Sequence, residues 1–226
     1  MKNLTFFFSF FLTFNLTLFA QIERCGKDIK LQERLKENPE LANIIDLQNK
    51  QIANYTINNK ASAVITIPVV VHVVYNTSSQ NVSDAQIYSQ INVLNEDYRR
   101  LNSDAVNTPS VFSGVDTEIE FCLATSDPNG NPTTGITRTS TTYNEIGNTT
   151  RYYSTARGGK DIWNRDNYLN IWVCDLGPLY LGFAYAPNTA PSSYDGLVID
   201  PRYFGTIGSA QAPYNKGRTA THEIGH

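Results

Sequence analysis

The sequence predicts an α/β domain with a mixed, twisted sheet and a short polar helix at the end of the chain. Three observations predict this class: β-branched runs of strand length, an amphipathic helical stripe after the first of them, and a histidine-bearing helical motif over the last residues. The chain has 226 residues, which suits one medium domain with flanking segments.

The first twenty residues have the pattern of a secretory signal peptide. Lys2 precedes an apolar run over residues 4–14, and small Ala20 precedes Gln21. The run is short and interrupted by Thr and Asn, which disfavours the alternative of a membrane anchor. We therefore expect residues 1–20 to be removed and the protein to be secreted, with no membrane partner. A net charge of −3 offers no basic face, so we also expect no nucleic-acid partner.

Residues 21–60 are expected to form a separate segment ahead of the domain. Charged residues are dense there, and sparse apolar residues recur at helical spacing, which predicts two short amphipathic helices separated by Asn38-Pro39. Such a segment cannot build its own core and has to pack against a larger body. We interpret it as a pro-segment released by cleavage near Lys60-Ala61. The alternative is a solvated helical spacer.

Residues 61–226 are expected to form the domain itself. Residues 69–75 are a β-branched run of the kind that forms a buried strand. Ser83, with Gln86 three residues later, predicts a capped helix start, and an apolar stripe follows. Further strands are predicted at residues 117–123, 168–174 and 197–199.

His72 lies inside the first β-branched run. A histidine surrounded by valines in a strand is expected to be a hydrogen-bonded core residue, and we do not assign it to a metal.

The last six residues, Thr-His-Glu-Ile-Gly-His, carry the chemistry. Positions i and i+4 share one face of a helix, so His222 and His226 can bind one ion. Zn²⁺ accepts such nitrogens and keeps a position open for water when three protein ligands bind it. Glu223 would take a proton from that water as general base. With only three histidines in the chain, a chance match is disfavoured. Gly217-Arg218-Thr219 predicts a turn and a hydroxyl N-cap before this helix.

Residues 217–226 resemble the active-site helix of the pappalysin family of metzincin metallopeptidases, including its cytophagalysin-type members. The resemblance extends over roughly residues 65–226, through blocks at 67–75, 119–124, 158–164, 168–173 and 181–186. It implies a metzincin-like catalytic domain with an active-site helix. It also implies a secreted zinc endopeptidase that is made as a proenzyme and acts on proteins or peptides.

The family pattern continues past His226 with a third histidine six residues on and then a Met-turn. Because the sequence stops at His226, we expect it to be the N-terminal part of the catalytic domain, and as it stands to bind zinc weakly and to be inactive. One alternative is a gluzincin, whose third ligand is a distant Glu. Another is a non-catalytic binding or adhesion module with a decayed site.

Residues 181–185 and 195–199 resemble the family's edge-strand region above the cleft. The resemblance implies that a substrate binds antiparallel there through backbone hydrogen bonds. The alternative is an ordinary core strand with its loop.

The chain has three cysteines, so at least one thiol is left unpaired. Arg24-Cys25-Gly26 is similar to the cysteine switch of latent metzincins, in which a thiolate takes the open position on the zinc. Cys122 and Cys174 both fall in predicted strands, and a disulfide between them would leave Cys25 free. The alternative for Cys25 is a disulfide or a stray thiol.

Overall fold

The computed structural model describes residues 23–54, 63–112 and 114–226. The expected signal peptide and the expected boundary at residues 60–61 lie outside the described residues. Within the described ranges, every helix is too short or too polar to cross a membrane.

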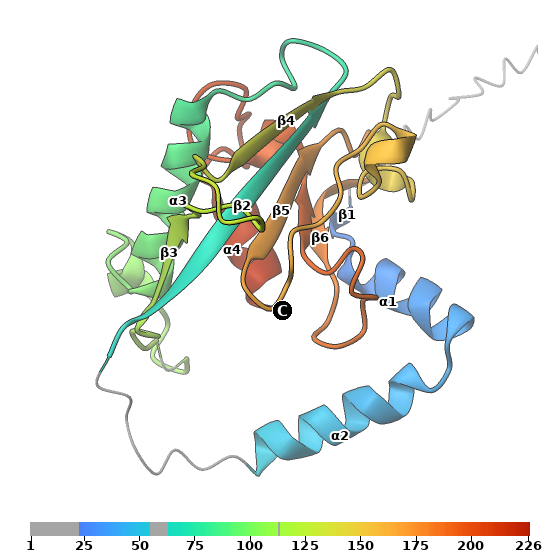
Figure 1. The fold of residues 1–226 in the computed structure, drawn as a ribbon. Coiled ribbons are helices and arrows are strands. Elements are labelled where there is room, and N and C mark those ends of the chain that lie inside the picture. The colour runs from blue at the N-terminus through green and yellow to red at the C-terminus, as the bar shows by residue number, and fades with distance from the viewer. Residues whose placement is uncertain (1–22, 55–62, 113) are drawn as a thin grey trace, which may run out of the picture.

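The described residues form a twisted sheet of seven strands at the centre of the molecule (Figure 1). Its strands are β1 (Glu23–Cys25), β2 (Ile65–Tyr75), β3 (Ile119–Leu123), β4 (Ile136–Ser140), β5 (Leu169–Cys174), β6 (Tyr180–Ala184) and β7 (Leu197–Ile199). The order is β1-β6-β7-β5-β2-β3, and β4 pairs with the second half of β2. Strands β6 and β7 are antiparallel and all other pairs are parallel, so the prediction of a mixed sheet is confirmed.

Strand β2 holds the sheet together, because its β-branched side chains are buried in the cores on both faces of the sheet. Val69, Val71 and Val73 are fully buried in the core that the helices cover. Val74 is fully buried on the opposite face, where Trp172 belongs to a second apolar cluster. A strand buried on both faces reads as a continuous apolar run, which is why the sequence revealed it.

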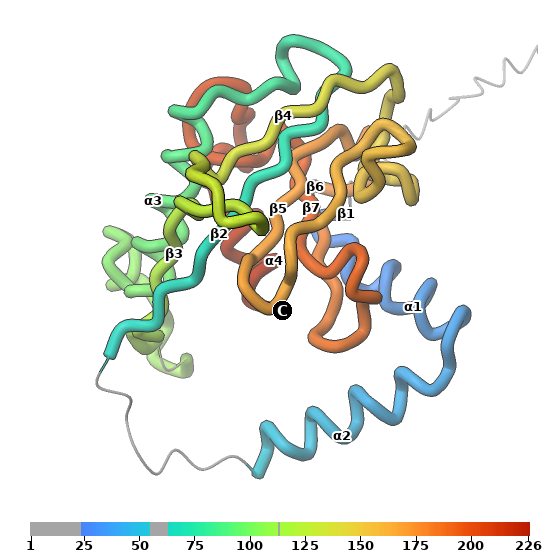
Figure 2. Tube along the Cα trace, in the orientation of Figure 1, coloured from blue at the N-terminus to red at the C-terminus, as the bar shows by residue number. Residues whose placement is uncertain are grey.

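In the described part of the chain, four α-helices accompany the sheet: α1 (Lys27–Glu37), α2 (Leu41–Ala53), α3 (Asp84–Tyr98) and α4 (Arg218–Ile224). Short 3₁₀ turns occur at Ala105–Asn107, Ile146–Asn148, Thr155–Arg157 and Pro201–Tyr203. Helices α3 and α4 pack together against one face of the sheet, while α1 and α2 lie beyond the edge formed by β1 and β6 (Figure 2).

At the start of α3, one of the two hydrogen bonds of the predicted capping box is formed. The Ser83 hydroxyl accepts a hydrogen bond from the Gln86 amide at 3.2 Å. The Gln86 side chain does not return to the cap. It donates instead to the carbonyls of Pro201 and Phe204, at 3.2 and 2.8 Å, and so ties α3 to the segment that leads into α4.

Residues 23–54, called here the N-terminal segment, contain β1, α1 and α2. The two helices are separated at Asn38-Pro39, as the sequence predicted. Helix α2 buries only Leu41, and no residue of α1 is buried. The segment is attached to the domain through β1, which pairs in parallel with β6.

His72 is a core residue, as predicted. It is fully buried, and its Nε2 lies 3.0 Å from Asn170 Oδ1. Asn170 uses its amide nitrogen to donate to the Trp163 carbonyl, so its oxygen has to accept and Nε2 of His72 carries the proton. Nδ1 then accepts from the Thr137 hydroxyl at 2.8 Å. Burial lowers the pKa of His72 to about 4.

Because its pKa falls on folding, His72 is expected to destabilise the protein in acid. The unfolded chain binds the proton near pH 6.5 and the folded chain only near pH 4, so stability is lost as pH falls between these values. The pKa difference corresponds to about 3 kcal/mol. Unfolding by urea at pH 7 and pH 4.5 should show a smaller loss in His72→Gln than in the wild type. Parallel pH profiles for the two proteins would contradict this.

The predicted disulfide between Cys122 and Cys174 is wrong, because all three cysteines are free. In the sheet, Cys122 lies beside Pro68 on one flank of β2, and Cys174 lies beside Val74 on the other. Six residues of strand span about 20 Å. A disulfide needs Cα atoms within about 7 Å, so the pairing is excluded in this fold.

Candidate metal centre

Helix α4 begins at a left-handed glycine and is held by ion pairs to α3 and the loop after it. Gly217 precedes it with φ 71° and no side-chain cap, so the predicted hydroxyl N-cap is wrong. Arg218 pairs with Asp104 at 2.6 Å and with Asp97 at 3.1 Å. The Thr221 hydroxyl donates to Asp97 at 2.8 Å. These contacts fix the rotation of α4 about its axis and turn its next residues toward β6.

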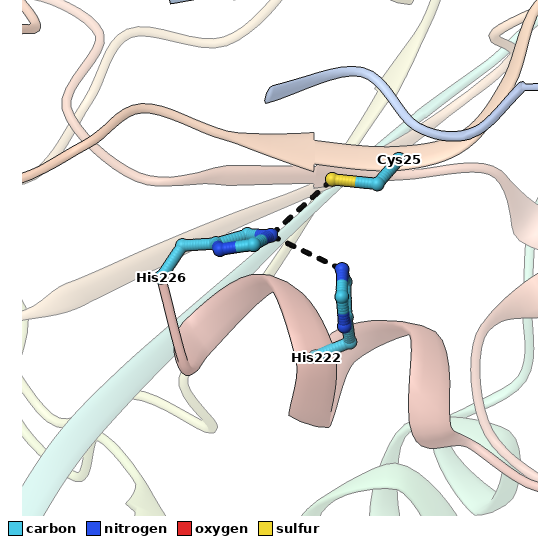
Figure 3. A group of neighbouring side chains, drawn as sticks. All are labelled: Cys25, His222 and His226. Carbon is cyan, nitrogen blue, oxygen red and sulfur yellow. Dashed lines mark hydrogen bonds between the residues drawn. The ribbon is translucent and has the colours of Figure 1, made fainter. Parts of the chain in front are cut away.

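His222 on α4 and His226, two residues past the end of α4, point their ring nitrogens at one place. Their Nε2 atoms are 3.1 Å apart, as the i and i+4 spacing predicted (Figure 3). His222 is exposed and His226 is half-buried, so the place between them is open to solvent on one side.

Cys25 approaches the histidines from β1, on the side opposite α4 (Figure 3). Strand β1 pairs with β6 so that Cys25 lies beside Gly182, and the Gly26 amide donates to the Gly182 carbonyl at 2.9 Å. This register places Cys25 Sγ 3.3 Å from His226 Nε2. A side chain at Gly26 would meet Phe183 Cβ at 3.0 Å, so the close approach of the two backbones depends on glycine.

Glu223 is buried beside this cluster. The Cys25 thiol is 3.5 Å from its Oε2, and its Oε1 is buried without a partner among the described residues. Burial raises the pKa of Glu223 to about 7, against the lowering effects of the Cys25 hydrogen bond, the Ala184 amide and Lys27. A carboxylate with a pKa near neutrality is suited to accept and return a proton.

The donor set fits a zinc ion. The ligand atoms of Cys25, His222 and His226 all lie within 4.8 Å of one another. In a tetrahedral zinc site, two nitrogens that each lie about 2.0 Å from the ion are about 3.3 Å apart. This is close to the 3.1 Å between Nε2 of His222 and Nε2 of His226. Burial raises the pKa of Cys25 to about 11, and a bound cation would oppose this by stabilising the thiolate. Glu223 Oε1 has no hydrogen-bond partner among the described residues, so it is able to accept a hydrogen bond from a water.

Sequence reasoning missed one residue at the centre. Lys27 Nζ lies 3.2 Å from His226 Nδ1. Its place in the charged run after Cys25 gave no signal for this role, because the contact joins residues 199 positions apart.

No family model matches the chain, but individual relatives do. An extracellular metalloprotease of Arthroderma gypseum is 31% identical over 167 residues, which are 72% of this chain and 46% of that protein. One of Pyricularia oryzae is 29% identical over 212 residues, 90% of this chain and 62% of that protein. The chain spans about half the length of several curated relatives that it matches.

Two solved structures from Tannerella forsythia are more similar. A promirolysin mutant is 48% identical with TM-score 0.77, over 90% of this chain and 68% of that chain. Mature mirolysin in complex with a cleaved peptide is 56% identical with TM-score 0.67, over 74% of this chain and 63% of that chain.

The fold, the pair of His222 and His226, and these relatives define the class as that of the metallopeptidases. The chain belongs to the pappalysin family of metzincin metallopeptidases, in its cytophagalysin-type branch.

Proposed function

We propose that the chain is part of the latent precursor of a secreted zinc endopeptidase. The observation that carries this proposal is the cluster of Cys25, His222 and His226, with Glu223 buried beside it. Two histidines on one helix face with an adjacent carboxylate are the elements of metal-assisted peptide hydrolysis. Cys25, from the N-terminal segment, would block this chemistry by binding the metal.

In the proposed mechanism His222 and His226 hold the zinc ion. When bound, the ion supplies a water of lowered pKa and polarises the substrate carbonyl. Glu223 accepts the proton of the attacking water and later returns it to the leaving amine. Its burial at 1% exposure removes competing water from the carboxylate and favours this exchange at neutral pH.

The substrate is proposed to lie along β6, antiparallel to it. Among the described strands, β6 has β7 on one side and β1 on the other, so removal of β1 frees the hydrogen-bonding edge of β6. By contrast, Leu197–Ile199 lies between β5 and β6, which matches the alternative of an ordinary core strand for that part of the predicted edge region.

Latency is proposed to come from the N-terminal segment. Its strand β1 occupies the edge of β6, and Cys25 occupies a position at the metal centre. The promirolysin comparison supports this, because it covers 90% of this chain whereas mature mirolysin covers 74%. The named extracellular relatives support secretion.

Metal analysis of the full-length protein tests the proposal. We expect about one zinc per chain, and a loss of most of it in His226→Gln, because each ligand is needed to hold the ion. His72→Gln is the control, since His72 lies in the core, and it should keep its zinc.

Elemental analysis with a peptide-cleavage assay separates the alternatives. Zinc without cleavage after removal of the N-terminal segment would favour a binding module. Absence of zinc in the wild type would contradict the proposed centre altogether. A third ligand identified as a distant Glu would move the protein to the gluzincins.

A further inference from the structure

Helix α3 has two buried glutamines on the face that meets the segment leading into α4. Gln86 is 1% exposed and Gln90 is 0% exposed, and because they are four residues apart they share one face of the helix. Side chains of this kind are seldom buried unless their polar atoms are hydrogen bonded. Gln86 meets this condition through the two carbonyls named above and through its Oε1, which accepts from the Ser209 amide at 3.0 Å.

Gln90 contacts residues further along the chain. Its Oε1 accepts from the Gly205 amide at 2.7 Å, and its Nε2 donates to the Gly217 carbonyl at 2.8 Å. A backbone N–H at one end and a carbonyl at the other match the oxygen and the nitrogen of the side-chain amide. Gly217 is the residue immediately before α4. Gln90 therefore joins the middle of α3 directly to the start of the helix that carries His222 and Glu223.

Helix α4 depends on its neighbours for its position. It has seven residues, and isolated helices of that length are not stable in water. Gly217 provides no side chain as a cap. The ion pairs of Arg218 involve a side chain that is 42% exposed, so solvent weakens them. The hydrogen bond from Gln90 is buried, and loss of a buried partner costs more free energy than loss of an exposed one.

The start of α4 decides where its later side chains lie. His222 and Glu223 follow Gly217 by five and six residues, which is about one and a half turns. A side chain at Gly217 would meet Val93 on α3 at 3.1 Å, so the two backbones fit closely here. A tilt or shift at Gly217 is carried along the helix to the zinc ligand and to the base. Displacement of a reacting group by about 1 Å can slow a reaction about 10²-fold.

We infer that Gln90 is a positioning residue for the metal centre. Through the Gly217 carbonyl it sets the place of α4, and with it the places of His222 and Glu223. This inference rests on the proposed function as a zinc peptidase. Gln86 has the same side chain, helix and burial, but its hydrogen bonds go to the loop ahead of Gly217. Gln86 therefore supports the fold and does not set the start of α4.

Zinc affinity and peptide kinetics of Gln90→Met test the inference on the full-length protein. Methionine keeps the length of the side chain and removes both hydrogen bonds. The zinc dissociation constant, measured by competition with a chelator, is expected to rise about tenfold. After removal of the N-terminal segment, kcat is expected to fall about tenfold. KM should change by less than about twofold, because Gln90 is buried and cannot contact the substrate.

Gln86→Met is the matched control. It also removes buried hydrogen bonds, so it should lower Tm by a similar amount, yet zinc affinity and kcat should stay at the wild-type level. Wild-type zinc affinity and kcat in folded Gln90→Met would overturn the inference, because Gln90 would then serve the fold alone. Equal losses of zinc affinity in the two variants would overturn it as well. Absence of zinc in the wild type would contradict the proposed function, and the inference would fail with it.

Gln90→Glu provides a second test that applies even where the methionine variant does not fold. Its carboxyl still accepts from Gly205, but it can donate to the Gly217 carbonyl only when it is protonated. Burial raises the pKa of such a carboxyl, so it is expected to be protonated at about pH 6 and ionised at about pH 9. Zinc affinity relative to the wild type should therefore be near one at the lower pH and about tenfold lower at the higher pH. A ratio that does not change with pH would overturn the inference.

Discussion

Glu223→Gln is expected to lower kcat for peptide cleavage by about 10²- to 10⁴-fold, the range for removal of a general base. The amide keeps the shape of the side chain but cannot accept the proton of the attacking water. Zinc content should stay at the wild-type level, because His222 and His226 are unchanged. The measurement is steady-state kinetics on the full-length protein without its N-terminal segment, with elemental analysis of the same sample.

The control for this substitution is Glu96→Gln on α3, an exposed residue outside the metal centre. It should keep both turnover and zinc. A near-normal rate in Glu223→Gln would show that another group accepts the proton. Loss of zinc in Glu223→Gln would show that the carboxylate supports the ligands, and the kinetic result could not then be assigned to proton transfer.

Cys25→Ala is expected to give a precursor that cleaves peptides while its N-terminal segment is still attached. The thiol lies 3.3 Å from His226 Nε2 and 3.5 Å from Glu223 Oε2, within the centre where we propose that the zinc ion and its water bind. Without it, water gains access to the ion, and we expect at least about a tenfold gain over the wild-type precursor. The assay uses freshly purified precursor, with the segment confirmed to be intact by mass spectrometry.

Cys122→Ala is the matched control, because Cys122 is a free, exposed thiol on β3, far along the sheet from the centre. Its precursor should be as latent as the wild type. Equal latency in Cys25→Ala would mean that β1 on the edge of β6 and α1 over the cleft block access by themselves.

The parts of the fold that the sequence revealed are those with local patterns. The valines of β2 form a nearly continuous run because both faces of the strand are buried. His222 and His226 are four residues apart, a spacing that brings their rings together at the end of α4. Strand β4, with the sequence Ile-Thr-Arg-Thr-Ser, was missed because it is polar and only partly buried, and its existence depends on pairing with β2. Strand β1 has three residues and exists only through β6.

The parts of the site that the sequence did not reveal depend on strand order. A disulfide between Cys122 and Cys174 was plausible for two residues in strands. However, β3 and β5 pair with β2 on opposite sides, and the two cysteines lie beside opposite ends of β2. Cys25 is therefore not singled out as the one unpaired thiol, and its place at the centre follows from the register of β1 with β6. The contact of Lys27 with His226 follows from that same register and has no local signature.

The register of β1 also has a consequence for the order of assembly. Cys25 meets Glu223 and His226 across 198 and 201 positions of the chain. Contacts of such long sequence separation form late in folding, because a large loop has to close first. The two histidines are only four positions apart, so their pairing needs no such closure. During synthesis the Cys25 thiol is already part of the chain when the histidines are added, and its arrival beside them depends on the later pairing of β1 with β6.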